Sequence, residues 1–404
     1  MSSAQRFKAP LLLGFLVLMQ ACQPHAWAAP HIPDSDSAVL ERLPVKANDP
    51  TGRELRGLRE ALAADPRNAG AAERLARKFF DLASAEGDPR YIGYAEAALR
   101  PWAAGDAWSP KAPADIVLAG ALLKQYRHDF EPAMKDLDRV LELEPANSEA
   151  ISWQFALHLV RADYANARKS CEQLRPHATE LAATACTAVI DSINGKSRAA
   201  YKTLSSALAA HPAQSAEYRQ WVLTRLGEMA LRLDDKALAE KHFKEALAVD
   251  LVDGFALAAY ADLLLDQNRP AEVLPLLKNF ENSDVLLLRL ALAASALKSP
   301  EAPKFVRSMA DRFAASALRG DRLHLQEQAR FELSLNHNPA AALKLILDDW
   351  GVQREPRDAR FLMEAALAAG DAAAARPALE WMDTTGYEDP RYRALADQLR
   401  KAGK

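Results

Sequence analysis

The residues that could carry catalysis are few and scattered. The sequence contains no P-loop, no glycine-rich dinucleotide turn, no HExxH and no GxSxG, so the usual signatures of nucleotide, metalloprotease and hydrolase sites are missing. No two of its histidines stand three or four residues apart, the spacing that places two metal ligands on one helix face. The acidic pairs Asp234-Asp235 and Asp348-Asp349 fit helix ends, where capping accounts for them. We therefore expect no catalytic residues, no cofactor and no metal ligands.

Composition and charge exclude two further classes of protein, disordered proteins and nucleic-acid binders. Of the 404 residues, 50% are hydrophobic and 26% are charged, which is the composition of a folded rather than a disordered protein. The 51 Lys and Arg residues are outnumbered by 54 Asp and Glu residues, and the formal net charge is −3. Because a nucleic-acid binder needs an excess of positive charge, we expect no nucleic-acid partner.

The N-terminus has the pattern of an export signal. Arg6 and Lys8 precede an apolar run over residues 11–19, long enough for the hydrophobic region of a secretory signal and too short to span a bilayer as a helix. Residues 26–28, Ala-Trp-Ala, fit the small-x-small cleavage rule. Residues 1–28 are therefore predicted to be a signal peptide, and the product to be exported and periplasmic. Residues 29–50 are polar and contain several prolines, which predicts a linker.

A second processing route stays open at Cys22. Residues 19–22, Met-Gln-Ala-Cys, resemble the lipobox of bacterial lipoproteins, in which the cysteine is acylated and anchors the chain to a membrane. Ala21 fits that pattern, whereas Met19 and Gln20 depart from its usual residues. The sequence leaves a soluble and a lipid-anchored product open. Lipidation of Cys22 is the one membrane contact we expect.

The body of the chain repeats a pattern of apolar residues with a period of about 34 residues. Each copy has a small or aliphatic residue, a larger one four positions later and an apolar one three positions after that, which is one face of a helix. The small position holds Ala133, Ala167, Ala200, Ala239 and Val273, the larger holds Leu137, Cys171, Leu204, Phe243 and Leu277, and the third holds Val140, Leu174, Ala207, Ala246 and Phe280. A small side chain at the first position lets two helices cross closely.

Each copy follows another helical stretch, and short breakers separate the two helices. The breakers are residues 128–129, 162–163, 195–197, 234–235, 268–270 and 370–371. No stretch shows a sustained alternation of β-branched and polar residues, so we predict no strands. The pattern as a whole predicts stacked helical hairpins.

In its period and its small-then-large helix face the chain resembles a tetratricopeptide repeat (TPR) protein. The match is clearest over residues 114–283, with divergent N-terminal helices at 51–113, looser TPR-like repeats at 284–387 and a C-terminal cap helix at 388–404. The resemblance implies an all-α fold, a right-handed superhelix (α-solenoid) of about nine helical hairpins. The Trp and Tyr usual in the first helix of such repeats are mostly replaced, for example by Val117 and Leu223.

In such a fold Cys171 falls on the second helix of one repeat and Cys186 on the first helix of the next, and these helices pack side by side. In an oxidising compartment the pair is a disulfide candidate that would close a loop of about 15 residues and contribute about 3 kcal/mol. Two buried thiols are the alternative. A redox-active pair is disfavoured because no CxxC spacing is present.

The resemblance places function in the concave groove, which is lined by the first helix of each hairpin and usually holds a peptide or partner segment. The family's groove positions correspond here to Tyr126, Glu149, Trp221, Thr224, Glu228, Arg232, Asp262 and Asp266. An exposed Trp221 beside acids fits a partner segment with an apolar anchor and basic flanks, although packing between helices explains Trp221 equally well. The Lys and Asn clamp by which some TPR domains hold a terminal carboxylate is missing.

The sequence thus predicts a non-catalytic, exported TPR scaffold for protein–protein interactions in the periplasm or cell envelope, with a role in assembling an envelope complex. Its expected partner is a protein or peptide segment in the concave groove. An accessory protein for metal or cofactor handling, using dispersed His and acidic residues brought together by curvature, is the alternative.

Overall fold

The structure, a computed structural model, describes Ser35 and residues 49–105, 107–249, 251–320 and 322–403. Met1–Arg53 and Glu54–Lys404 form two units. The signal peptide predicted at 1–28, the lipidation candidate Cys22 and almost all of the linker predicted at 29–50 lie outside the described residues. Helix α1 (Pro50–Ala64) begins in the first unit, and all the other helices belong to the second.

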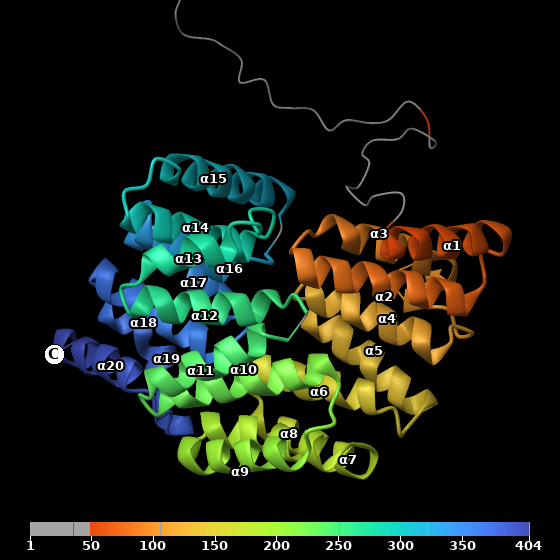
Figure 1. The fold of residues 1–404 in the computed structure, drawn as a ribbon, viewed down its shortest axis with the longest axis horizontal. Coiled ribbons are helices and arrows are strands. Elements are labelled where there is room, and N and C mark those ends of the chain that lie inside the picture. The colour runs from red at the N-terminus through yellow and green to blue at the C-terminus, as the bar shows by residue number, and fades with distance from the viewer. Residues whose placement is uncertain (1–34, 36–48, 106, 250, 321, 404) are drawn as a thin grey trace, which may run out of the picture. The chain divides into compact units, whose positions relative to one another are not determined.

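The second unit is an array of antiparallel helical hairpins (Figure 1). Within the described residues, α2 to α19 pair consecutively into nine hairpins, and α20 (Pro390–Ala402) follows them. The predicted all-α solenoid is confirmed. The first helices are α2 (Ala69–Glu86), α4 (Ala114–Tyr126), α6 (Ser148–Val160), α8 (Glu180–Ile193), α10 (Ala216–Arg232), α12 (Gly254–Asp266), α14 (Asp284–Ala296), α16 (Leu325–Ser334) and α18 (Pro356–Ala369). The second helices are α3 (Arg90–Leu99), α5 (Phe130–Leu143), α7 (Tyr164–Leu174), α9 (Ser197–Ala210), α11 (Lys236–Leu247), α13 (Pro270–Leu277), α15 (Ala302–Arg319), α17 (Pro339–Trp350) and α19 (Arg376–Thr385).

The turns inside the hairpins share one backbone feature. One residue in each turn takes a left-handed conformation, with φ between 52° and 72°. The amide after it commonly donates to the carbonyl five residues back, as from Asp129 to Lys124 and from Asp235 to Ala230, which closes the first helix as a Schellman motif does. These left-handed residues are Gly87, His128, Ala162, Gly195, Asp234, Asn268, Lys298, His337 and Gly370. All six predicted breakers fall on these turns.

The repeated small residues of the second helices lie in the protein interior. At this position Ala133, Ala167, Ala200, Ala239 and Val273 are all buried. Gly227 on α10 shows how little room the crossing leaves, because a Cβ atom on it would lie only 2.6 Å from Cε1 of Phe243 on α11. The predicted helix face is therefore the packing face of the hairpin.

The prediction of no strands is wrong at one place. Between α3 and α4, β1 (Ala103–Ala104) pairs antiparallel with β2 (Ala107–Trp108). The Trp108 ring lies against α4 at Gly120, where an added Cβ atom would be 2.0 Å from Cζ2 of the ring. Strands of two residues are too short to show the alternation by which a sequence reveals a strand.

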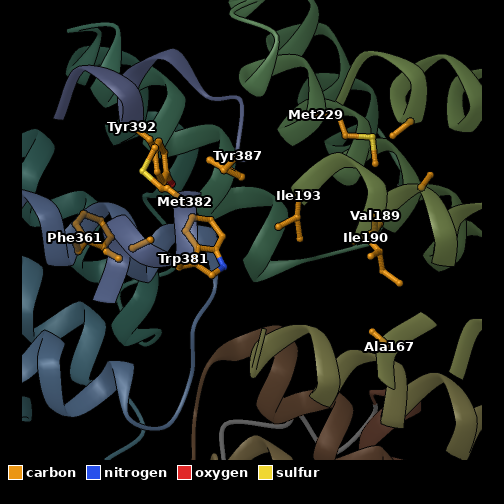
Figure 2. Packing of buried hydrophobic residues seen from close by; sticks show 14 of the residues in the cluster. Ala167, Val189, Ile190, Ile193, Met229, Phe361, Trp381, Met382, Tyr387 and Tyr392 are labelled. Atoms are coloured by element: carbon orange, nitrogen blue, oxygen red, sulfur yellow. The ribbon is translucent and has the colours of Figure 1, made fainter. Parts of the chain in front are cut away.

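The C-terminal hairpins fold back on the middle of the array. One buried cluster contains side chains from α6 to α10 together with side chains from α16 to α20. Figure 2 shows Trp381 and Tyr387 in the same cluster as Ile193 and Met229. Because these residues are far apart in the sequence, the cluster ties the end of the solenoid to its centre.

Hydrogen bonds reinforce this long-range packing. The backbone amide of Arg354 donates to the carbonyl of Val160 at 2.7 Å. The indole Nε1 of Trp381 donates to the Tyr164 hydroxyl at 3.0 Å, and the amide of Ser197 donates to Glu388 Oε2 at 2.8 Å. The sequence predicts a closing cap helix at 388–404. In the structure, the segment that leads into α20 also bonds to the array at the start of α9.

Candidate functional site

A cavity of about 140 Å³ lies where the C-terminal helices face the middle of the array. It is lined by residues of α6, α8, α10 and α12 on one side and of α16, α18 and α20 on the other. Its charged lining consists of six arginines, Arg225, Arg232, Arg330, Arg357, Arg360 and Arg391, and five carboxylates, Glu228, Asp262, Asp266, Glu355 and Asp389. This charge-lined cavity is the candidate site.

Asp262 on α12 is held by two arginines. Arg289 on α14 donates to both of its carboxylate oxygens at 3.1 and 2.8 Å, and Arg330 on α16 donates to Oδ1 at 2.5 Å. Burial alone would raise the pKa of Asp262, but the positive charges of Arg289 and Arg330 hold that pKa below its ordinary value. Asp262 is therefore ionised, and its negative charge pairs with arginines of the same chain.

Asp266, one turn further along α12, joins two C-terminal helices. Arg360 on α18 donates to both carboxylate oxygens at 2.7 and 2.8 Å, the bidentate geometry that suits a guanidinium. Arg391 on α20 donates to Oδ2 at 2.9 Å and also pairs with Asp389. Burial works against the charged form of Asp266, but its bonds with Arg360 and the charge of Arg391 lower its pKa.

Arg232 at the end of α10 is bonded to hydroxyl groups. Its Nε donates to the Tyr387 hydroxyl at 3.1 Å and its Nη1 to Ser192 Oγ at 2.9 Å. The guanidinium also lies over the Tyr387 ring, 5.6 Å from the centroid. Arg232 thus connects α8, α10 and the segment before α20 across the cavity.

Phe255 on α12 lies under two guanidinium groups. The Arg225 Cζ is 4.4 Å from the ring centroid and the Arg357 Cζ is 5.0 Å from it, both within cation–π range. Arg225 pairs with Glu228 at 2.9 Å, but its buried Nε has no hydrogen-bond partner among the described residues. Two guanidinium groups, those of Arg225 and Arg357, therefore contact the single aromatic ring of Phe255.

Four of the eight groove residues predicted from the sequence line this cavity: Glu228, Arg232, Asp262 and Asp266. Three of them are the acids that suggested basic flanks on a partner. Each of these acids is already paired with an arginine of the same chain, so that expectation loses its basis.

Thr224 and Trp221 both make contacts within the helical array. Thr224 is buried, and its hydroxyl donates to the Gln220 carbonyl in its own helix at 2.9 Å. Trp221 is partly buried against the hydrophobic cluster and stacks on Tyr218, with ring centroids 5.6 Å apart. The Arg225 guanidinium also lies over the Trp221 ring, 5.7 Å from its centroid.

Tyr126 and Glu149 lie apart from the cavity, against α2. The Tyr126 hydroxyl donates to the Ala83 carbonyl at 3.4 Å, and both carboxylate oxygens of Glu149 accept from Arg77, at 2.6 and 2.9 Å. These two residues fasten α4 and α6 to the first hairpin, so neither belongs to the candidate site.

The repeat pattern of the sequence does not reveal the arginines that the C-terminal helices bring to the cavity. Arg360 lies 94 residues and Arg391 125 residues from Asp266, and no repeat pattern pairs them. One signal was present, however. Arg357 and Arg391 each follow a proline in the first turn of a helix, where the helix dipole disfavours a cation. Such placements indicate that the arginine has another partner.

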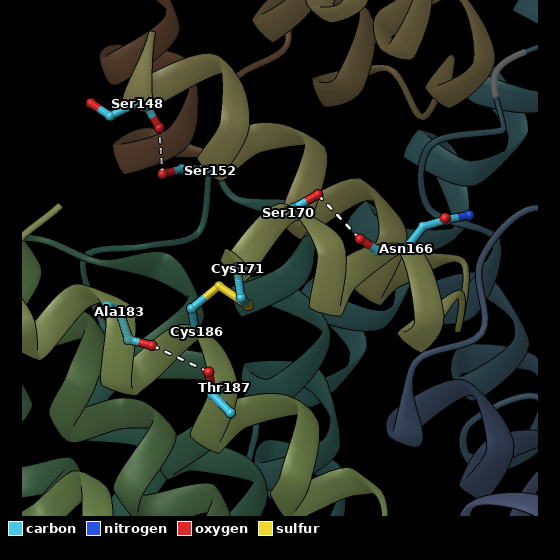
Figure 3. Close-up of a disulfide and its surroundings, with 8 residues drawn as sticks. All are labelled: Ser148, Ser152, Asn166, Ser170, Cys171, Ala183, Cys186 and Thr187. Carbon is cyan, nitrogen blue, oxygen red and sulfur yellow. Dashed lines mark hydrogen bonds between the residues drawn. A yellow bond between two sulfur atoms is a disulfide. The ribbon is translucent and has the colours of Figure 1, made fainter. Parts of the chain in front are cut away.

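Cys171 on α7 and Cys186 on α8 are joined in the structure (Figure 3). Their sulfur atoms are 2.02 Å and their Cα atoms 5.7 Å apart. Both residues are buried in the cluster shared with the C-terminal helices. The bond connects the second helix of one hairpin to the first helix of the next, as the repeat arrangement predicts.

Reducing this bond should lower the free energy of unfolding by about 2–4 kcal/mol, because the unfolded chain regains the freedom that the closed loop removes. Urea unfolding with and without reductant measures the change. A Cys171→Ala/Cys186→Ala variant is the control and should not respond to reductant. Two titratable thiols in the unreduced, denatured protein would instead establish the buried-thiol alternative.

Metal binding finds no support in the part of the chain that the structure describes. There, no three His, Cys, Asp or Glu side chains are grouped so that they could hold a metal ion. His128 and His324 are near enough to interact, and burial followed by the charge of His324 lowers the pKa of His128 to about 4.

Among the helices that the structure describes, none is both long enough and apolar enough to cross a bilayer.

The repeated hairpins, their left-handed turns and the small residues at the helix crossings define an all-α solenoid of the TPR type. No family model and no curated protein matches the chain. Among solved structures, the APC/C hetero-tetramer Cut9–Hcn1 aligns with a TM-score of 0.50 at 14% identity, over 88% of this chain and 67% of that one. Yeast Tom70 aligns with a TM-score of 0.38 at 14% identity, over 86% and 85%. A tetratricopeptide repeat protein from Parabacteroides merdae aligns with a TM-score of 0.26 at 14% identity, over 86% and 100%. At these identities the comparison with Cut9–Hcn1 bears on the fold alone.

Proposed function

We propose that this protein is a non-catalytic scaffold that binds a protein or peptide segment at the charge-lined cavity. The observation that carries the proposal is the composition of the cavity wall. First helices of six hairpins, α6, α8, α10, α12, α16 and α18, converge there with arginine, carboxylate and aromatic side chains. Arginine and aromatic residues are the types that dominate protein interfaces.

The fold supports the same proposal. In TPR-type solenoids the surface lined by the first helices is the usual place for a bound segment. The Cut9–Hcn1 structure, which has a similar fold, is a hetero-tetramer of two kinds of chain. We carry to the present chain only the idea that such an array assembles with a second protein.

We further propose that the protein acts after export, in the periplasm or on a membrane of the cell envelope, in the assembly of an envelope complex. The basic and apolar pattern of residues 6–19 supports export, and a Cys171–Cys186 bond suits an oxidising compartment. The intact mass of the mature chain tests this directly. A chain starting at Ala29 means a soluble product, an acylated Cys22 means an anchored one, and an uncleaved Met1 contradicts export.

Site-specific crosslinking tests the scaffold proposal. A photoreactive phenylalanine analogue replaces Phe255 in the cavity, and the same analogue replaces Leu318, an exposed residue of α15, as the matched control. The tagged chain is crosslinked in its own cells and purified. A reproducible protein adduct at position 255 that is absent at position 318 is the expected result. No adduct in cells where the chain is folded, or identical adducts at both positions, would contradict a scaffold that uses the cavity.

A further inference from the structure

The N-terminal hairpin meets the array again at α12 and α14. Helices α2 and α12 lie in contact where α2 ends and α12 begins (Figure 1). A Cβ atom on Gly254, the first residue of α12, would lie 3.6 Å from the carbonyl oxygen of Ser84 on α2. A Cβ atom on Gly87, in the turn after α2, would lie 2.5 Å from Oγ of Ser283, the N-cap of α14. These contacts, the N-terminal closure, join parts of the chain that are far apart in the sequence.

The N-terminal closure differs from the packing of the C-terminal helices. The C-terminal helices share one buried hydrophobic cluster with α6 to α10, and Trp381 and Tyr387 belong to it. A second buried cluster extends from α10 to α16. Among the described residues, neither of these two clusters includes a buried side chain of α2 to α5. Contacts outside a shared core separate at a lower free-energy cost, so the array should open at the N-terminal closure before it opens at the C-terminal helices.

The N-terminal closure lies beside the charge-lined cavity. Phe255, which follows Gly254 in α12, lines that cavity. The cavity volume of about 140 Å³ has room for one side chain, since a water molecule takes about 30 Å³ of the liquid. A peptide segment with its backbone needs more room. Because curvature accumulates from small rotations at every hairpin, separating α2 from α12 would widen the approach to Phe255.

His128 lies near the N-terminal closure, in the left-handed turn between α4 and α5. Two residues before it, the Tyr126 hydroxyl donates to the Ala83 carbonyl near the end of α2. Burial, followed by the negative charges of Asp88 after α2 and of Asp284 at the start of α14, raises the pKa of Tyr126 to about 12. This end of α4 therefore lies close to both sides of the closure.

The His128 ring is partly buried and stacks on Phe130, with ring centroids 5.2 Å apart. The charges of His324 and Glu327, at the start of α16, act on it from across the array. Burial, followed by the charge of His324, lowers the pKa of His128 from 6.5 to about 4, although Glu327 acts in the opposite direction. A proton on His128 is therefore unfavourable while the array is closed.

The acids nearest His128 already have positive partners. Asp284 pairs with Arg312 at 2.7 Å, and Glu327 lies 3.7 Å from His324 and 3.8 Å from Arg289. The titratable and charged groups around His128 come from α16 and the residue before it, from α14 and α15, from the turn after α2 and from its own hairpin: His324, Glu327, Asp284, Arg289, Arg312, Asp88, Arg90, Tyr126, Arg127 and Asp129.

We propose that the N-terminal closure is a pH-sensitive contact that opens when His128 is protonated. Its consequence for binding rests on the proposed function, since opening gives a partner segment access to Phe255. An exposed histidine binds its proton more tightly than His128 does in the closed array, so a falling pH favours the open form. Between about pH 6.5 and pH 4 the ratio of open to closed molecules should rise by up to about tenfold per pH unit.

Single-molecule FRET across the closure tests the proposal on the full chain. The dyes are attached through Ala97→Cys on α3 and Ala310→Cys on α15, both at exposed positions. Cys22→Ser removes one native cysteine, and Cys171 and Cys186 are bonded to each other, so the dyes react at the introduced positions. From about pH 7.5 to about pH 5 the ratio of open to closed molecules should rise about thirtyfold.

Two histidine variants connect the response to His128. His128→Asn removes the titrating ring and suits the left-handed backbone at this position, where φ is 62°, so it should abolish the response. His337→Asn is the matched control, because His337 is exposed and takes the same left-handed place in the turn between α16 and α17, with φ of 52°. It should respond as the wild type does. A response that survives in His128→Asn, or a wild type that stays closed at about pH 5, overturns the proposal.

A glycine variant tests the contact itself at about pH 7.5. Gly87→Ala adds a Cβ atom against Ser283 and should move molecules to the open form. Gly370→Ala carries the same left-handed strain, with φ of 70° and no neighbouring atom within 4 Å of its Cβ, and should stay closed. Equal distances in the two variants, with melting temperatures that show both to be folded, would mean that this contact does not close the array. The crosslinking at position 255 decides the scaffold proposal separately, so the two failures are distinguishable.

Discussion

Replacing Arg289 with alanine should lower the free energy of unfolding by about 3–5 kcal/mol. Arg289 is fully buried, donates to both oxygens of Asp262 and lies 3.8 Å from Glu327. Its loss leaves Asp262 without its main cation and removes one of the positive groups that, after His324, act on Glu327, and of these two acids Arg330 reaches Asp262 alone. An uncompensated buried charge costs much more than the pair itself contributes, so we expect the largest single-residue effect of the charge network here.

Urea or thermal unfolding measures this loss, and two further variants separate charge from packing. Arg289→Met fills much of the same volume without the charge, so it should recover only the part of the loss that comes from the cavity. Arg307→Ala, on the exposed surface of neighbouring α15, should change stability by less than about 0.5 kcal/mol. A loss below about 1 kcal/mol for Arg289→Ala would mean that Arg330 and His324 suffice to hold the two acids.

The fold could be predicted because every hairpin repeats the same helix packing and the same kind of turn. The small residue of the second helix is buried in all five copies that the sequence revealed, from Ala133 to Val273. The breakers take the left-handed turn whether the residue is Gly195, Ala162 or Asp234. These features depend on neighbours within one period, and a sequence pattern records such neighbours directly.

The site could be predicted only in part because it depends on how the array curves. Glu228, Arg232, Asp262 and Asp266 were found since they occupy repeat positions on first helices. The arginines that pair with these acids could not be predicted, because Arg360 and Arg391 reach Asp266 only when the C-terminal helices return to α12. Curvature accumulates from small rotations at every hairpin, and no single repeat encodes it. A repeat pattern therefore shows these acids on the first helices but not the arginines of the same chain that pair with them.

Replacing Asp349 with asparagine should stabilise the protein at alkaline pH and flatten the dependence of its stability on pH. Asp349, near the end of α17, is buried, and among the described residues its carboxylate oxygens accept hydrogen bonds only from Gln353 Nε2, at 3.3 and 3.4 Å. Burial, followed by the negative charges of Asp358, Glu327 and Glu355, raises the pKa of the Asp349 carboxyl. Asparagine keeps an acceptor for Gln353 without a charge to bury.

The sign follows from proton linkage. A carboxyl whose pKa is raised by folding holds its proton in the folded state at pH values where the unfolded chain has released it. Stability is therefore greatest below the ordinary aspartate range near pH 4 and falls as the pH rises through the raised pKa, by up to about 1.4 kcal/mol per pH unit for each extra proton held. The range from about pH 7 to pH 9 lies above the ordinary aspartate pKa and below those of tyrosine and lysine, so the slope is measured there.

Unfolding curves over that range, for wild type, Asp349→Asn and Asp348→Asn, measure the effect. Asp348 is the matched control because it neighbours Asp349 on α17 but is exposed. Wild type and Asp348→Asn should lose stability together as the pH rises, while Asp349→Asn should lose much less. Parallel curves for all three would place the proton elsewhere, and Asp358 is then the next position to test. Its pKa is raised by burial and by Glu355, and it directly follows Arg357 on the helix that forms one wall of the cavity.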